Sequence, residues 1–170
     1  AVNAALTGHL LISSLHTNDA IGAVQRLINL GVSINDLTTA VNAFIAQRLV
    51  RVLCDCKKSQ KLTTQETETI TKHLNEISDK VAVEKPQTKN VFVPGGCEKC
   101  NGIGYKGRTV VSEVFIMDDD LREMISTGAL LPEIKKKAIE NGMLTMEQDA
   151  VLKILEGITT LEEADRVTNL

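Results

Sequence analysis

The sequence predicts an α/β protein, and three observations carry this prediction. A strand–loop–helix unit opens the chain, a strand-like segment stands at residues 108–117, and helix-capping patterns punctuate everything after it. The length of 170 residues allows one ordinary domain or two small ones. A chain of this size can bury enough apolar surface to fold without disulfides or other crosslinks.

The first unit begins with the apolar run LLISSL at residues 10–15, which predicts a buried strand. A polar cluster follows and would form a loop at the end of this strand. A helix comes next, capped by Thr17 or Asn18 and closed at Gly31. Its apolar residues recur at helical spacing: Ile21, Val24, Leu27 and Ile28.

A second helix is predicted from about Asn35, with Ser33 as its cap. Its core-facing residues would continue as far as Leu49: Ile34, Leu37, Val41, Phe44, Ile45 and Leu49. The segment LVRVL at residues 49–53 would then form a strand.

The composition changes between Cys54 and Cys100, where apolar residues become fewer and Lys, Thr and Glu become more frequent. We therefore place a subdomain there. Thr63 and Glu66 have the spacing of a capping box and predict a helix over 64–81. Residues 81–90 are typical of a linker, and NVFVPGG after them of a short strand that enters a turn.

The last part of the chain predicts one strand and four helices. The strand is RTVVSEVFIM at 108–117, which is rich in β-branched residues. The helices are marked by the residues at their ends: Asp118 and Gly128, Pro132 and Gly142, Thr145 with Gln148 and Gly157, and Thr160 with Glu163.

The composition excludes several classes of function. The formal charge is −3 and the aromatic residues are three Phe and one Tyr, so the chain has neither the positive field nor the stacking surfaces of a nucleic-acid-binding protein. No apolar run approaches the roughly 18 residues of a membrane span, and the first residues lack the pattern of a signal peptide. We expect a cytoplasmic protein that does not bind nucleic acid.

Four cysteines form two close pairs, which in a reducing compartment favours metal ligation over disulfides. Cys97 and Cys100 have the C-x-x-C spacing of a zinc site, whereas Cys54 and Cys56 have one residue fewer between them. We predict a structural zinc ion held by all four. The alternatives are four free thiols in a degenerate site, or a site in which His73 replaces one thiolate, although a solvated helix residue is the simpler interpretation of His73.

Two histidines flank the predicted first strand, His9 before it and His16 after it. Residues seven apart along a strand point to opposite sides, so the two need not share a site. His16 would lie at the carboxyl end of the strand, where α/β sheets place ligand-contacting groups, and it could position a water or contact a phosphate. The alternative is structural, with His16 as a turn residue and His9 as a helix-end residue.

Several segments together resemble one protein family. The segment ALTGHLLISSLHTN (5–18) resembles the histidine box of the secretion and type IV pilus motor ATPases. The segments QRLVR (47–51), GCEKCNGIGYKGR (96–108) and EGITTLEE (156–163) resemble that family in the same order, as does Glu113. The resemblance covers nearly the whole chain and is weakest at 57–92. The four cysteines point to the branch that assembles pili and type II secretion pseudopili.

This resemblance implies a hexameric ATPase with a RecA-like P-loop core, of which this chain would be the C-terminal part. The chain would divide into a partial core with the histidine box at 1–53, a tetracysteine subdomain at 54–107 and a strand with a helical tail at 108–170. The full-length protein would hydrolyse ATP with Mg²⁺. It would lie in the cytoplasm, peripheral to the inner membrane through platform and assembly proteins.

The resemblance also implies roles for individual residues. His16 would lie near the γ-phosphate, with Thr17 and Asn18 beside it at the nucleotide, and His9 would belong to the same box. The sequence nevertheless lacks the motif G-x-x-x-x-G-K-[ST] and an Asp-Glu pair at the end of a strand. We therefore expect an excised fragment that does not turn over ATP alone.

Two other classes of protein share some of these features. One is a non-catalytic, zinc-binding interaction or adaptor domain. The other is the cysteine-rich region of J-domain chaperones, whose C-x-x-C-x-G-x-G unit fits residues 97–104. That region repeats the unit four times, whereas this sequence contains it once.

Overall fold

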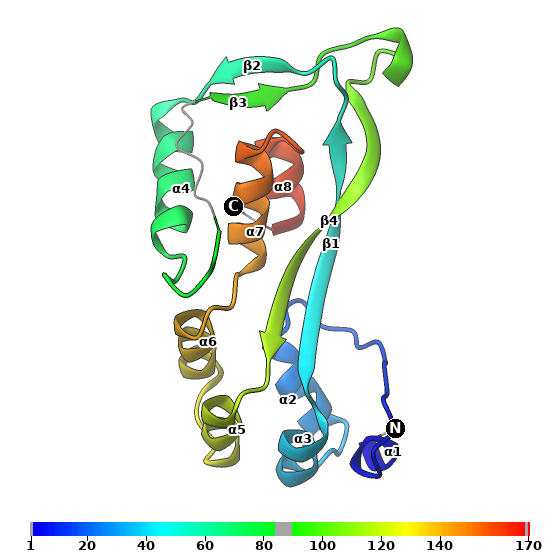
Figure 1. Cartoon of the computed structure of the whole chain (residues 1–170), viewed down its shortest axis with the longest axis vertical. Helices are drawn as coiled ribbons and strands as arrows, with labels where there is room; N and C mark the ends of the chain where they lie inside the picture. The colour runs from blue at the N-terminus through cyan, green and yellow to red at the C-terminus, as the bar shows by residue number, and fades with distance from the viewer. Residues whose placement is uncertain (1, 84–89, 169) are drawn as a thin grey trace. The chain divides into compact units, whose positions relative to one another are not determined.

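A computed structural model describes residues 2–83, 90–168 and 170, and it is a mixed α/β structure (Figure 1). Within these residues the chain forms two two-stranded sheets and eight α-helices. It folds into two compact units, each made of two stretches of chain. Unit 1 comprises residues 1–46 and 113–143, and unit 2 comprises residues 47–112 and 144–170.

Two long strands contribute to both units. These strands, β1 (Ala43–Leu53) and β4 (Tyr105–Ile116), pair with each other and run in opposite directions (Figure 1). At the unit 1 end of this ribbon Phe44 stacks on Phe115, with ring centroids 6.0 Å apart. Offset aromatic stacking of this kind strengthens a core beyond simple burial.

Unit 1 places five helices around its end of the ribbon. They are α1 (Val2–Leu6), α2 (Gly22–Asn29), α3 (Ile34–Ala40), α5 (Asp119–Ser126) and α6 (Leu131–Glu140). Helix α3 packs on α1, α2 and α5, and α5 packs on α6. The side chains at the centre of this packing are fully buried: Val24, Leu37, Leu121 and Ile134.

Unit 2 contains a short two-stranded sheet and three α-helices. The sheet pairs β2 (Lys58–Lys61) antiparallel with β3 (Asn90–Val93), with Lys58 opposite Val93. The helices are α4 (Thr64–Asn75), α7 (Met146–Leu155) and α8 (Leu161–Thr168), and a 3₁₀ turn, η1, covers Glu98–Cys100. Helix α7 packs against α4, α8 and β3 and provides more buried apolar side chains than any other element described in this unit.

The capping residues predicted from the sequence lie at the helix ends. Ser33 Oγ accepts the Asp36 N–H at the start of α3, and Asp118 Oδ1 accepts the Leu121 N–H at the start of α5. Capping boxes begin two further helices, Thr63 with Glu66 at α4 and Thr145 with Gln148 at α7. The strands predicted at NVFV and RTVVSEVFIM are also present, as β3 and β4.

The strand predicted at residues 10–15 is wrong. These residues form neither helix nor strand, and the side chains of Leu10 and Ile12 are 90% and 91% exposed. A strand is stable only when a neighbouring strand pairs with its backbone, and among the described residues the sheets are β1–β4 and β2–β3 alone. The helix that follows is present as α2, but Asp19 caps it by accepting the Gly22 N–H, rather than Thr17 or Asn18.

The second predicted helix is too long. It ends at Ala40, and Phe44, Ile45 and Leu49 belong to strand β1 instead. Burial along β1 alternates, with Phe44 buried and the large side chains of Ile45 and Leu49 exposed. Pairing with β4 satisfies the backbone hydrogen bonds of this segment. The side chains therefore alternate between the two faces of a strand, although the apolar residues also fit the spacing of a helix.

Two further differences concern residues 54–100. Strand β2 was not predicted, and α4 ends at Asn75 rather than continuing to 81. The predicted linker at 81–90 lies mostly outside the described residues. The division of the chain at residues 53 and 107 stays a prediction. No helix among the described residues is long and apolar enough to cross a membrane.

Candidate functional site

The four cysteine sulfur atoms gather in unit 2, within 4.8 Å of one another. Cys54 Sγ lies 3.8 Å from Cys97 Sγ, Cys56 Sγ lies 3.8 Å from Cys100 Sγ, and the two sulfurs of the C-x-x-C pair are 3.7 Å apart. The cluster is formed by the residues that follow β1 and by the 3₁₀ turn that precedes β4. The short Cys54-x-Cys56 spacing therefore still delivers both sulfurs to the same place.

The loops around the cluster depend on two glycines. A Cβ on Gly95 would lie 2.0 Å from the Cys56 carbonyl oxygen. Gly104 has a φ of +80°, and a Cβ there would lie 2.5 Å from Pro94 Cβ. Because only glycine avoids both conflicts, these two positions let the second cysteine pair approach the first.

Backbone N–H groups point at the sulfur of Cys100. Gly104 N–H donates to it at 3.2 Å and Cys97 N–H donates at 3.4 Å. These two bonds, the Cys97 bond foremost, lower the pKa of Cys100 to about 6, since they stabilise the thiolate. Desolvation, together with the neighbouring sulfurs, raises the pKa of Cys56 to about 12. Hydrogen bonding thus favours the thiolate of Cys100, whereas burial disfavours the thiolate of Cys56.

The spacing of the sulfurs fits a zinc ion. Four sulfurs at about 2.3 Å from one tetrahedral Zn²⁺ lie about 3.8 Å from each other, and three of the sulfur pairs here are separated by 3.7 or 3.8 Å. Four protein ligands would leave no position for a reacting water, so such an ion would be structural. His73 is on α4 and is not part of the group of metal-ligating side chains found among the described residues.

His16, Thr17 and Asn18 lie together in unit 1, at the start of α2. They line a hollow of about 300 Å³, which is also lined by Gln25 and Arg26 of α2. His16 and Asn18 are exposed, and Thr17 is half-buried. The residues that line the hollow thus carry an imidazole, a hydroxyl, amides, a guanidinium and the carboxylate of Asp19.

The loop that carries His16 has a defined shape. Thr17 Oγ1 donates to the Asp19 carbonyl at 3.0 Å, and Asp19 Oδ1 accepts the Gly22 N–H at 2.6 Å. One residue further on, the Ala20 N–H donates to Glu113 Oε1 at 2.9 Å. No site role for Glu113 follows from the sequence, because nothing local connects it to a loop 93 residues earlier.

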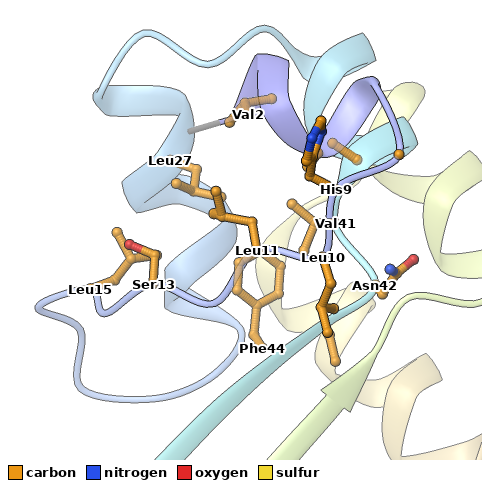
Figure 2. A pocket seen from close by; sticks show the side chains of 14 residues that line it. Val2, His9, Leu10, Leu11, Ser13, Leu15, Leu27, Val41, Asn42 and Phe44 are labelled. Atoms are coloured by element: carbon orange, nitrogen blue, oxygen red, sulfur yellow. The ribbon is translucent and has the colours of Figure 1, made fainter.

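His9 lines a different hollow from His16. This hollow has a volume of about 590 Å³ and also belongs to unit 1. Figure 2 shows His9 near Val41, with Leu11 beside Leu27 of α2 and Phe44 of β1 below them. His9 Nδ1 lies 3.2 Å from Thr7 Oγ1 and 3.3 Å from the Ala4 carbonyl. The polar atoms near His9 therefore belong to its own segment of chain.

Comparison with known proteins covers nearly the whole chain. Residues 1–166 match the type II/IV secretion system protein family. The chain is 40% identical over 163 residues to a type IV pilus assembly ATPase PilB of Thermus thermophilus, covering 96% of this chain and 17% of that protein. It is 39% identical over 171 residues to a type II secretion system protein E of Aeromonas hydrophila, covering 99% of this chain and 31% of that protein. The chain thus spans less than a third of the length of either relative, and it belongs to the type II/IV secretion system protein family.

Proposed function

We propose that this chain is part of a hexameric motor ATPase that powers the assembly of type IV pili or of type II secretion pseudopili. The observation that carries the proposal is the identity of about 40% along almost the whole chain to proteins named as pilus assembly ATPases. In this proposal the chain is the C-terminal part of a RecA-like core, and the P-loop and the Mg²⁺ ligands lie in another part of the full-length protein.

The hollow at the start of α2 would be this chain's contribution to the nucleotide site. His16 would contact the terminal phosphate or its attacking water, with Thr17 and Asn18 beside it. His9 lines another hollow, so its role would be to support the loop rather than to contact ATP. Hydrolysis of ATP needs positioned charges on the phosphates, and this chain alone would not supply them.

The cysteine cluster would hold a structural zinc ion. Its four sulfurs are spaced for tetrahedral ligation, and the metal would close the chain between Cys56 and Cys97 into one folded loop. The expected partners of the full-length protein are five further copies of itself and the platform and assembly proteins of the inner membrane. It would lie in the cytoplasm and reach the membrane only through those partners.

Substitution of His16 in the full-length protein tests this proposal. We expect His16→Ala to lower kcat roughly 10- to 1000-fold, as for the loss of one positioned polar group, with an unchanged melting temperature. His9→Ala should have a smaller effect. His73→Ala on α4 is the matched control, because it removes an imidazole from unit 2 and should leave kcat unchanged.

Steady-state ATPase assays of the purified hexamers distinguish the outcomes. An unchanged kcat in a folded His16→Ala hexamer would reject the role at the phosphate. A full-length wild-type protein without ATPase activity would reject the motor and favour a zinc-binding adaptor.

A further inference from the structure

Glu113 is a carboxylate in a row of apolar side chains. It lies on β4 between Val111 and Phe115, and because strand positions alternate, these three side chains share one face. Val111 and Phe115 are fully buried, and Glu113 itself is only 2% exposed. Burial of a carboxylate is costly, whereas an apolar side chain of similar length would fill the same space without that cost. The presence of a carboxylate here therefore calls for a role that an apolar side chain lacks.

The backbone hydrogen bond of Glu113 indicates that role. Its Oε1 accepts the N–H of Ala20, which is 1% exposed and precedes α2 by two residues. Ala20 follows His16 by four residues, at the end of the loop that lines the hollow at the start of α2. The bonds of Thr17 and Asp19 shape this loop from within, whereas the bond of Glu113 joins it to the strand ribbon.

We propose that Glu113 is a positioning residue that holds the His16 loop in place for ATP hydrolysis. This inference rests on the proposed function. Strand β4 is a firm support, since at this end it carries Phe115, which stacks on Phe44 of the paired strand. The hydrogen bond from the Ala20 N–H is buried at both ends, and a hydrogen bond that is protected from water is electrostatically stronger than an exposed one. Displacement of a reacting group by about 1 Å can cost 100-fold in rate, so the anchor of the loop matters for kcat.

Two substitutions in the full-length protein separate the acceptor from the space it fills. Glu113→Met keeps the length of the side chain but removes the acceptor, and we expect kcat for ATP to fall roughly 10- to 100-fold with KM changed by less than about threefold. Glu113→Gln keeps an oxygen that can accept the Ala20 N–H, and we expect kcat within about threefold of the wild type.

The control is Asp118→Ala. Asp118 also accepts a backbone N–H in unit 1, that of Leu121, but it caps α5 and does not touch the His16 loop. We expect this variant to melt at a lower temperature while its kcat stays unchanged. In each variant the loss of kcat is compared with the fall in melting temperature. If the ratio of the two is the same in Asp118→Ala and Glu113→Met, the role of Glu113 is merely structural and the inference is overturned.

Hydrogen exchange of the same full-length variants provides a readout besides activity. In Glu113→Met the peptide that covers residues 16–24 should exchange at least roughly tenfold faster, with Glu113→Gln close to the wild type and the α5 peptide unchanged. If the wild-type enzyme is active, unchanged exchange or unchanged kcat in Glu113→Met overturns this inference and leaves the proposed function intact. An inactive wild-type enzyme overturns the proposed function, and the role of Glu113 in catalysis with it.

Discussion

At the scale of single residues, a second buried carboxylate shows how such a group can serve stability. Glu163 on α8 is 1% exposed, and its Oε1 accepts a hydrogen bond from Arg51 Nη2 at 2.6 Å. The backbone N–H of Arg51 donates to the other oxygen at 3.0 Å, and Arg166 donates to both. These donors, the Arg51 side chain foremost, lower the pKa of Glu163 to about 2 and fasten α8 to strand β1.

This ion cluster predicts a specific pH dependence. Because the pKa of Glu163 falls from about 4.5 to about 2 on folding, its contribution is fully present above pH 4.5 and is lost as the pH falls toward 2. Glu163→Gln should lower the free energy of unfolding by about 2 kcal/mol at pH 7, the value of a hydrogen bond to a charged group. The matched control is Glu162→Gln, which changes the neighbouring exposed carboxylate. This variant should change the free energy of unfolding by less than about 0.5 kcal/mol.

Urea unfolding between pH 2.5 and 7 measures both differences. The difference between wild type and Glu163→Gln should shrink steadily below pH 4.5. A difference that stays constant down to pH 2.5 would show that packing, rather than ionisation, accounts for the effect.

The two candidate sites differ in how far they could be predicted. The cysteine cluster follows from spacing, because residues two or three apart in a loop must lie close together and two such pairs suffice for a metal site. The bond between Glu113 and Ala20 has no such local signal, since a strand and a loop 93 residues apart meet only in the folded unit. Sequence patterns therefore find sites made of neighbours and miss residues that act across the fold.

At the scale of elements, helix ends were predicted well and strands less well. A cap is a local interaction, as in Thr63 with Glu66, so its residues are sufficient to specify it. A strand depends on its partner. Strand β2, Lys58–Lys61, is polar and exposed at all four positions, and it exists because β3 pairs with it. The run at residues 10–15 has the composition of a strand but no partner among the described residues.

The end of α7 gives a prediction at this scale. Gly157 follows the helix with a φ of +69°, and a Cβ there would lie 2.5 Å from the Phe92 ring of β3. The same Cβ would lie 2.8 Å from Lys57 Nζ, which donates a hydrogen bond to the Gly157 carbonyl. Gly157→Ala should therefore destabilise the protein by about 3 kcal/mol, because it adds overpacking to the strain of a left-handed backbone.

Gly128 provides the matched control for this substitution. It follows α5 with a φ of +77° and has open space around its Cα, so Gly128→Ala should cost only the backbone strain of about 1 kcal/mol. Thermal or urea unfolding of both variants makes the comparison. Equal losses at the two positions would show that contact with Phe92 contributes nothing.

At the scale of the whole molecule, each compact unit is assembled from two separate stretches of chain. Helices α5 and α6 belong with residues 1–46, whereas α7 and α8 belong with the cysteine cluster. The sequence predicts a single helical tail, because periodicity and caps describe helices one at a time and carry no information about which of them share a core. This division decides which helices a metal ion in unit 2 can stabilise.

The last prediction concerns that metal ion. Protein purified without a metal-affinity column should contain one equivalent of zinc by elemental analysis, and Cys97→Ser should reduce it to less than about a tenth. All four ligands lie in unit 2, where the ion would close the 40 residues between Cys56 and Cys97. Since binding energy at such a site is folding energy, chelation should destabilise unit 2 first.

Hydrogen exchange after removal of the metal distinguishes the two units. Peptides from α4, α7 and α8 should lose protection, while peptides from α5 and α6 in unit 1 retain it. Ser59→Ala on the exposed strand β2 serves as the control. Ser59 follows Cys56 by three residues and is not one of the four cysteine ligands, so its loss should leave zinc content and exchange unchanged. Less than about a tenth of an equivalent in the wild type, with four thiols that titrate freely, would instead mean that the cluster is held by its loops alone. Equal loss of protection in both units on chelation would mean that the ion stabilises the fold as one cooperative whole.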